Sequence, residues 1–204
     1  MNIITISREF ASGGRELGKR LADALGYDYY DREIISALAK KAELDEGYVE
    51  AVLQNQSFSN FDFSFSNSFT NMDVMTTNKI QLLVKQQEVI EQIAQVNRNC
   101  IIVGRNADMI LKQYKPLSLF VCASKEAKIK RCKEKAKEYQ VVSEKDMLKK
   151  MKQIDKNRIK TRILMGGEFG NKYEFHFCIN SGDIEMKKLV KMVKVMAENY
   201  FDNK

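Results

Sequence analysis

The sequence is poor in the residues that build metal centres and disulfide frameworks. It has one histidine, and its four cysteines (Cys100, Cys122, Cys132 and Cys178) show no C-x-x-C spacing. A zinc site needs several such ligands at suitable spacings, so we expect no metal-ligating side chains. Three of the cysteines lie in apolar, strand-like runs, where a free thiol behaves as a small buried hydrophobic group. These features favour a reducing compartment, and we expect a cytoplasmic protein.

Long hydrophobic runs are also missing. No stretch approaches the roughly 18 consecutive apolar residues that a membrane helix requires. The N-terminus lacks a basic segment followed by a long apolar one, as a secretory signal would have. We therefore expect no membrane span and no signal peptide. With 204 residues, 44% of them hydrophobic, the chain is long enough for one domain with a full core.

The positive charge is concentrated in one segment. The chain carries a net charge of +7, yet residues 125–162 hold 15 Lys or Arg and 6 Asp or Glu, a net charge of +9. Such a block is typical of a solvated helical face, a nucleic-acid footprint or the lining of a phosphate site. Tyr139 is its only aromatic residue, and base stacking would need more. We therefore rank nucleic-acid binding last and expect no nucleic-acid partner.

The first 26 residues predict a strand, a glycine turn and a helix. Residues 2–7 are rich in Ile and Thr, typical of a strand buried on both faces. After the turn at residues 11–14, apolar residues recur at helical spacing as far as Gly26, a candidate C-terminal cap. This order presents backbone N–H groups and a helix N-terminus to a phosphate. Plain packing of a strand against a helix is the alternative interpretation.

The glycine turn departs from the standard phosphate loop, G-x-x-x-x-G-K-[ST]. When Gly13 is placed on the second glycine of that pattern, Gly14 falls on the lysine, while Arg15 and Glu16 fall on the metal-binding hydroxyl and its neighbour. We predict that the cation has moved one place, to Arg15. The residues expected to bind the cofactor are Ser12, Gly13, Gly14, Arg15 and Glu16.

Polar residues also follow two other predicted strands. Asp31 comes just after a β-prone run at residues 27–30, where it either caps a helix or projects into a site at the carboxyl end of the sheet. The apolar run at residues 100–103 leads into Gly-Arg-Asn-Ala-Asp. Arg105 would place a planar guanidinium, suited to bidentate phosphate binding, at the mouth of the sheet. An ion pair between Arg105 and Asp108 is the alternative.

Two arginines share one face of a later helix. Residues 143–146 have the form of a capping box that opens a helix. Near its end, Asp155, Arg158 and Arg162 stand at i, i+3 and i+7. Two cations one turn apart would neutralise a polyphosphate during transfer. A structural ion pair between Asp155 and Arg158 is the alternative.

Strands are expected near residues 2–7, 27–30, 100–103, 117–122 and 175–180, with helices between them. This alternation predicts a mainly parallel sheet with helices on both faces. Residues 57–70 are almost wholly Ser, Phe and Asn, and we interpret them as an insertion beside the site.

The motifs together carry a resemblance. ITISREFASGGRELGKRLADALG, YDREII, IIVGRNAD, LFVCAS before a basic helix, a D-x-x-R segment, a Gly-rich loop and FCINSG follow one another in this order. Over residues 1 to about 182 the chain resembles the cytidylate kinase-like family, a branch of the P-loop nucleoside monophosphate kinases. The resemblance implies one domain over residues 1–204 with a three-layer α/β/α fold and about five strands. It also implies an acceptor-binding insertion at about 35–75 and a basic helical lid at about 140–170.

The resemblance further implies a function and a site. ATP and magnesium would be the cofactors, and the reaction would be phosphoryl transfer to a nucleoside monophosphate, such as CMP, or to a similar small acceptor. The catalytic residues would be Arg15, Arg158 and Arg162, and the acceptor would lie near Asp31, Arg105, Asn106 and Asp108.

The phosphate loop leaves a second interpretation open. Cytidylate kinases retain Gly-Lys-Ser where this chain has Gly14-Arg15, and Glu16 stands where a hydroxyl is expected. A nucleotide-binding module without transfer activity is therefore the alternative. The sequence does not predict the oligomeric state.

Overall fold

The structure, a computed structural model, describes residues 1–31, 34, 36–37, 40, 71–96, 98–135 and 143–202. The chain forms two compact units, one of residues 1–31 and 96–204 and the other of residues 32–95. In the second unit, α4 is a helix over Asn71–Gln95. Residues 57–70 and most of the predicted insertion lie outside the described residues. The single domain with an insertion therefore stays a prediction.

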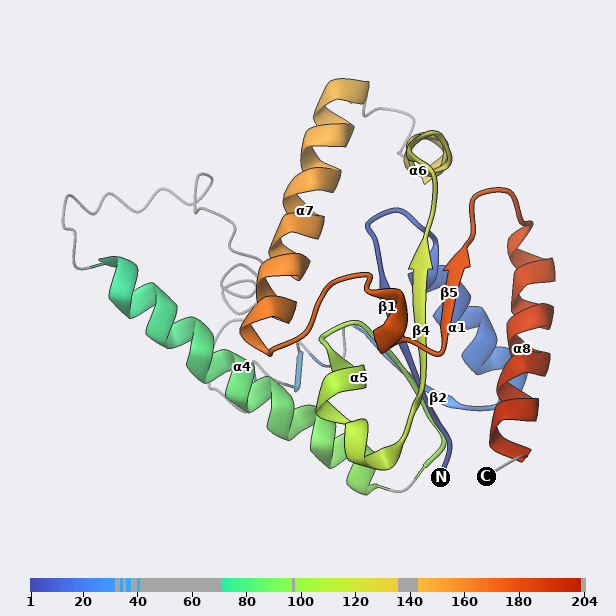
Figure 1. The fold of residues 1–204 in the computed structure, drawn as a ribbon, viewed down its shortest axis with the longest axis horizontal. Coiled ribbons are helices and arrows are strands. Elements are labelled where there is room, and N and C mark those ends of the chain that lie inside the picture. Colours follow the sequence, from blue (N-terminus) through green and yellow to red (C-terminus); the bar gives the residue numbers. More distant parts are fainter. Residues whose placement is uncertain are drawn as a thin grey trace. The chain divides into compact units, whose positions relative to one another are not determined.

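The first unit alternates strands and helices, as its apolar runs predict (Figure 1). Its elements are β1 (Ile3–Arg8), α1 (Gly14–Leu25), β2 (Asp28–Tyr30), β3 (Cys100–Val103), α5 (Ala107–Ile110), β4 (Leu117–Cys122), α6 (Lys125–Lys135), α7 (Glu144–Leu164), β5 (Phe177–Asn180) and α8 (Met186–Asp202). Two short 3₁₀ helices cover Lys112–Tyr114 and Lys172–Glu174.

The five strands form one sheet in the order β2-β3-β1-β4-β5, and every neighbouring pair is parallel. In the central strand, Ile4 lies opposite Ile101 on one side and Leu117 on the other. The predicted fold class, α/β with a mainly parallel sheet of about five strands, is confirmed. Because the strands are parallel, their carboxyl ends meet at one edge, and that edge positions the site.

The core packs α1 and α8 against one face of the sheet, and the two helices lie side by side (Figure 1). The close approach of α1 depends on Gly18, because a Cβ there would lie 2.7 Å from Cγ2 of Val103. The buried cluster is Ile4, Ile6, Leu17, Leu21, Ala22, Ile101, Val103, Leu117, Leu119, Val121, Leu189, Val190, Val193 and Ala197. Burying a side chain such as Leu or Ile contributes about 1.5–3 kcal/mol.

The single histidine ties the edge strand β5 to its neighbours. Nδ1 of His176 accepts the backbone N–H of Ser118 at 3.1 Å and lies 2.7 Å from the Ser118 hydroxyl. Nε2 lies 3.1 Å from the hydroxyl of Tyr200 in α8. This histidine therefore connects β4, the start of β5 and α8.

Ser143 caps the N-terminus of α7, where the capping-box pattern predicts that a helix begins. The Ser143 hydroxyl accepts the backbone N–H of Asp146 at 3.2 Å. No helix among the described residues is long and apolar enough to cross a membrane.

Candidate functional site

The glycine turn links β1 to α1 at the carboxyl edge of the sheet. Gly13 has φ +83°, a left-handed conformation that glycine adopts without strain, and α1 begins at the next residue. Ser12 is fully buried, and its hydroxyl donates to the carbonyl of Glu9 at 2.9 Å. The carbonyl of Ser12 accepts a hydrogen bond from the Ser181 hydroxyl. The Ser12 side chain thus shapes the turn from inside.

Both glycines of the turn make room for arginines. A Cβ on Gly13 would lie 2.8 Å from Cζ of Arg131, and one on Gly14 would lie 2.8 Å from Cβ of Arg8. Gly14 occupies the position where the standard loop has its lysine. The close packing of Arg8 explains why a glycine stands there.

A cavity of about 910 Å³ lies over the glycine turn. Its lining includes three acidic side chains, Glu9, Glu16 and Asp23. Its seven basic lining residues are Arg8, Arg15, Lys19, Arg20, Arg131, Lys135 and Arg158. The surplus of four positive charges, beside a helix N-terminus, suits an anionic ligand of nucleotide size.

Asp31 sits between two of the arginines. One carboxylate oxygen is 2.5 Å from Nε of Arg15, and the other is 3.7 Å from Nη2 of Arg8. The Asp31 side chain is 6% exposed, whereas that of Arg15 is 55% exposed. Asp31 therefore projects toward the glycine turn. This position agrees with the interpretation that Asp31 points into a site at the carboxyl end of the sheet. The guanidinium of Arg15 is close to the turn and held by this carboxylate.

Arg8 is a site residue that our reading of the sequence missed. Its guanidinium lies against Gly104 at the end of β3, where a Cβ would be 2.6 Å from Cζ of Arg8. Burial, together with the positive charge of Arg158, lowers the pKa of Arg8 to about 9, and the carboxylate of Asp31 opposes this shift. Arg8 thus remains protonated at neutral pH. The signal in the sequence is its place as the last residue of β1, immediately before the loop.

The turn after β3 brings further predicted residues to this edge. Gly104, Arg105 and Asn106 have φ values of +78°, +59° and +52°, three left-handed residues in a row. The charge of Arg105 contributes to the lowered pKa of Arg8, so the two guanidinium groups influence one another. The Asn106 amide instead points to Sδ of Met165, 3.1 Å away.

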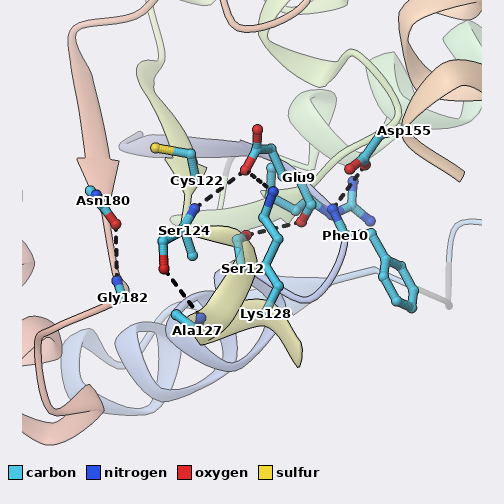
Figure 2. A network of polar contacts seen from close by, with 12 residues as sticks. Glu9, Phe10, Ser12, Cys122, Ser124, Ala127, Lys128, Asp155, Asn180 and Gly182 are labelled. Atoms are coloured by element: carbon cyan, nitrogen blue, oxygen red, sulfur yellow. Dashed lines mark hydrogen bonds and ion pairs between the residues drawn. The ribbon is translucent and has the colours of Figure 1, made fainter. Parts of the chain in front are cut away.

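Arg158 fixes α7 to the loop that contains the glycine turn. Its Nη1 donates to the carbonyl of Arg8 and to Oδ1 of Asp155, both at 3.0 Å. The same Asp155 oxygen accepts the backbone N–H of Phe10 at 2.8 Å (Figure 2). Burial lowers the pKa of Arg158 and raises that of Asp155, while the charge of each opposes the shift in the other. The ion pair that the sequence offers as the alternative is present and also anchors the loop, while the catalytic role of Arg158 stays a prediction.

Arg162 lies in a second network outside the cavity lining. Its side chain is 1% exposed and pairs with Asp108 at 2.8 Å and with Glu174 at 2.5 Å. Its Cζ lies 4.9 Å from the ring centroid of Phe175. Asp108 also accepts from the Ser7 hydroxyl at 3.3 Å. The structure therefore groups Asp108 with Arg162 and not with the glycine turn, and the catalytic role of Arg162 stays a prediction.

Glu9 is a second residue that our reading missed. One carboxylate oxygen is 2.5 Å from Nζ of Lys128 and accepts the backbone N–H of Ala123 at 3.3 Å. Figure 2 shows these contacts together with the Ser124 hydroxyl, which accepts the N–H of Ala127 at 3.2 Å and caps α6. Glu9 thus connects the loop that contains the glycine turn to the start of α6.

Glu16 is surrounded by cations. Its carboxylate lies 3.0 Å from both Arg20 and Lys135 and 3.6 Å from Arg131. Burial alone would raise the pKa of Glu16, but the hydrogen bond from Lys135 and the neighbouring positive charges outweigh burial and lower it. The carboxylate is therefore ionised at neutral pH.

Solved structures show what the fold is similar to. A crystal structure of an uncharacterized protein from Eubacterium ventriosum ATCC 27560 is 24% identical with a TM-score of 0.70, and the match covers 100% of both chains. Shikimate kinase from Bacteroides thetaiotaomicron is 13% identical with a TM-score of 0.56, covering 97% of this chain and 98% of that one.

A third similar structure is deoxyadenosine kinase from M. mycoides, 12% identical with a TM-score of 0.51, covering 99% of this chain and 100% of that one. A comparison with curated proteins found no match. At these identities the structures establish the fold alone. The family model described as "Cytidylate kinase-like family" matches residues 3–183, so the chain belongs to the cytidylate kinase-like family.

Proposed function

We propose that the protein transfers the γ-phosphoryl group of ATP to a nucleoside monophosphate, CMP-like, or to a similar small acceptor. The observation that carries this proposal is the cavity over the glycine turn, lined by seven basic and three acidic residues. Membership of the cytidylate kinase-like family also supports this proposal. In the reaction, the bond between the γ-phosphorus and the β,γ-bridging oxygen breaks, an acceptor oxygen bonds to phosphorus, and ADP leaves.

The site residues fit the phosphates of ATP. Gly13 and Gly14 let the side chains of Arg131 and Arg8 approach the turn closely, and the N-terminus of α1 favours negative charge there. Among the described residues, no group of three or more His, Cys, Asp or Glu side chains could hold a metal ion. Magnesium would therefore be held mainly by phosphate oxygens of ATP, and it would help neutralise their charge.

The arginines would perform the charge stabilisation. Arg158, held by Asp155 and by the carbonyl of Arg8, is oriented before any ligand binds. Arg15 would exchange Asp31 for a phosphate oxygen, which its 55% exposed side chain permits. Asp31, released from Arg15, would then contact the acceptor beside Arg105. Positioning and charge stabilisation make up most of the catalysis of phosphoryl transfer.

The test is a coupled assay of ADP release with Mg-ATP and a panel of nucleoside monophosphates that includes CMP. Release that depends on one acceptor would establish the activity and name the acceptor. Arg15→Ala should lower kcat on the order of a hundredfold, as the loss of one charge-stabilising donor does in other enzymes. Arg98→Ala, which removes a 72% exposed arginine paired with Asp28, is the control. Equal rates in wild type and Arg15→Ala would remove Arg15 from the mechanism.

A second candidate is a nucleotide-binding module without transfer activity. It is favoured by Gly14 at the lysine position and by the pairing of Arg15 with Asp31. Calorimetry that detects ATP binding, in the absence of ADP release with every acceptor, would support it. Nucleic-acid binding has less support, because six described cations of residues 125–162 pair with carboxylates, namely Lys128, Arg131, Lys133, Lys135, Arg158 and Arg162.

A further inference from the structure

A cluster of three cations surrounds one carboxylate beside the glycine turn. Arg20 Nη2 lies 3.0 Å from one oxygen of Glu16. Lys135 Nζ lies 3.0 Å and Arg131 Nη1 lies 3.6 Å from the other oxygen. The cations come from α1 and α6, and they leave two positive charges in excess over the single acid.

The position of Glu16 is one that stabilises negative charge. Glu16 belongs to the first turn of α1, where the unpaired N–H groups of the helix favour an anion. Lys135, Arg20 and Arg131 together lower the pKa of Glu16 despite its partial burial. A phosphate placed among these cations would be favoured for the same reasons.

The cluster is continuous with the cavity through Arg131. All four members line the cavity together with the glycine turn. The Arg131 guanidinium lies against Gly13, where a Cβ would be 2.8 Å from its Cζ and Nη1. Its Nε is buried and has no hydrogen-bond partner within the described part of the chain. A buried N–H without an acceptor is costly, so the contact with Glu16 leaves the Arg131 guanidinium incompletely paired.

We propose that Arg20, Arg131 and Lys135 form an anion subsite for a phosphate group beside the glycine turn, which the carboxylate of Glu16 occupies until the ligand arrives. The inference rests on the proposed binding of phosphates in this cavity, and it does not require phosphoryl transfer. The ligand class is a polyphosphate or a phosphate ester. A purely structural tie between α1 and α6 is the competing explanation of the same contacts.

The two explanations differ in what removal of the carboxylate does. If Glu16 occupies the subsite in place of a phosphate, Glu16→Gln removes a competitor and strengthens phosphate binding. If Glu16 only ties two helices together, the same change leaves binding unchanged or weakens it. Lys135→Met removes a cation of the subsite from a side chain that is 62% exposed, so the fold should tolerate it.

Calorimetric titration with inorganic triphosphate, without magnesium, tests the subsite directly. Glu16→Gln should bind triphosphate about fivefold more tightly than wild type, and Lys135→Met about fivefold more weakly, which is the scale of single ion pairs at a partly exposed site. The matched control is Glu134→Gln, because Glu134 is an exposed carboxylate of α6 next to Lys135 and does not line the cavity. It should change the affinity less than twofold.

Several results would overturn the proposal. One is an unchanged or weaker affinity of Glu16→Gln, and another is the absence of triphosphate binding in all the proteins. Equal tightening in Glu134→Gln and Glu16→Gln would show a general effect of charge instead of a subsite. Wild-type affinity in Lys135→Met would likewise exclude this lysine from phosphate binding and overturn the subsite as proposed.

Titrations with ATP identify the source of the phosphate group. If both variants shift ATP affinity as they shift triphosphate affinity, the subsite takes a phosphate of the donor. If they shift only triphosphate affinity, the phosphate comes from another ligand. Both results support the subsite. If ADP release depends on an acceptor but triphosphate binding is unchanged in both variants, the subsite is wrong and the proposed function stands. If triphosphate binding shifts as expected but no acceptor gives ADP release, the subsite stands and the proposed function is wrong.

Discussion

The guanidinium of Arg8 lies directly on Gly104, so the last residue of β1 and the first residue after β3 share one small space. A Cβ on Gly104 would lie 2.6 Å from Cζ and 3.0 Å from Nη2 of Arg8. Gly104 also has φ +78°, and its N–H donates to the carbonyl of Ile6 at 2.9 Å. The glycine thus serves two needs, a left-handed turn and room for the arginine.

We predict that Gly104→Ala displaces Arg8, whereas Gly26→Ala has only a conformational cost. Gly26 has φ +68°, but nothing lies within 4 Å of a Cβ there. Gly26→Ala should therefore lower the free energy of unfolding by about 1–2 kcal/mol, the cost of a left-handed alanine. Gly104→Ala should lower it further and also weaken ATP binding, because the Arg8 guanidinium must move. Urea unfolding and calorimetry measure the two effects. Equal unfolding free energies and ATP affinities in the two variants would contradict the close approach.

A second prediction concerns the buried network of Arg162. Arg162→Met leaves the carboxylate of Asp108, 6% exposed, without the cation that lies 2.8 Å away. Breaking a buried ion pair by removing one partner costs about 3–5 kcal/mol, because the remaining charge is uncompensated. Urea unfolding should show a loss of this size.

The matched control for Arg162→Met is Lys160→Met. Lys160 is an exposed residue of the same helix, so its replacement should change the free energy of unfolding by less than about 0.5 kcal/mol. A loss below about 1 kcal/mol in Arg162→Met would show that Asp108 and Glu174 are readily rehydrated.

The sheet could be predicted from the sequence because its strands are short apolar runs between helices of clear periodicity. Residues 100–103 and 117–122 were predicted as strands and are β3 and β4. The last strand begins at Phe177, two residues later than predicted, because residues 172–174 form a 3₁₀ helix and His176 bonds to Ser118. These local signals identify elements well and their ends less well.

The pairing of the charged residues could be predicted only where the partners are close in sequence. The i, i+3 spacing gives the ion pair between Asp155 and Arg158. The contact of Arg8 with Gly104 and that of Glu16 with Lys135 join residues that lie far apart in the chain. No periodicity within one segment contains this information, which depends on the parallel order of the strands and on where α6 follows β4.

A third prediction concerns the histidine that connects β4, β5 and α8. His176→Phe leaves the backbone N–H of Ser118 without its Nδ1 acceptor, and Ser118 is 5% exposed. A buried donor without a partner costs about 1–3 kcal/mol. Tyr200→Phe removes only the hydroxyl at the other ring nitrogen, so it should cost about 0.5–1.5 kcal/mol. Unfolding measurements on both variants check this order, and an equal or larger loss in Tyr200→Phe would contradict it.

A fourth prediction is a loss of stability in acid that depends on Glu174. Burial alone would raise the pKa of this carboxyl group, but the hydrogen bond from Arg162, the N–H of Glu168 and the charge of Arg162 outweigh burial and lower it below its ordinary value of 4.5. Because the pKa is lower in the folded than in the unfolded chain, the ionised form stabilises the fold. That contribution is complete above pH 4.5 and is lost as the pH falls through the lowered pKa of the folded state.

The measurement is the free energy of unfolding as a function of pH between about 3 and 6, the range in which carboxyl groups of ordinary pKa titrate. Wild type should lose stability below pH 4.5, and Glu174→Gln should lose less over the same interval because one titrating group is gone. Glu126→Gln is the control, since Glu126 is an exposed residue of α6 and should leave the slope unchanged. Identical slopes in wild type and Glu174→Gln would mean that Arg162 does not hold Glu174 ionised. Asp108 would then be the one carboxylate among the described residues that balances the charge of Arg162.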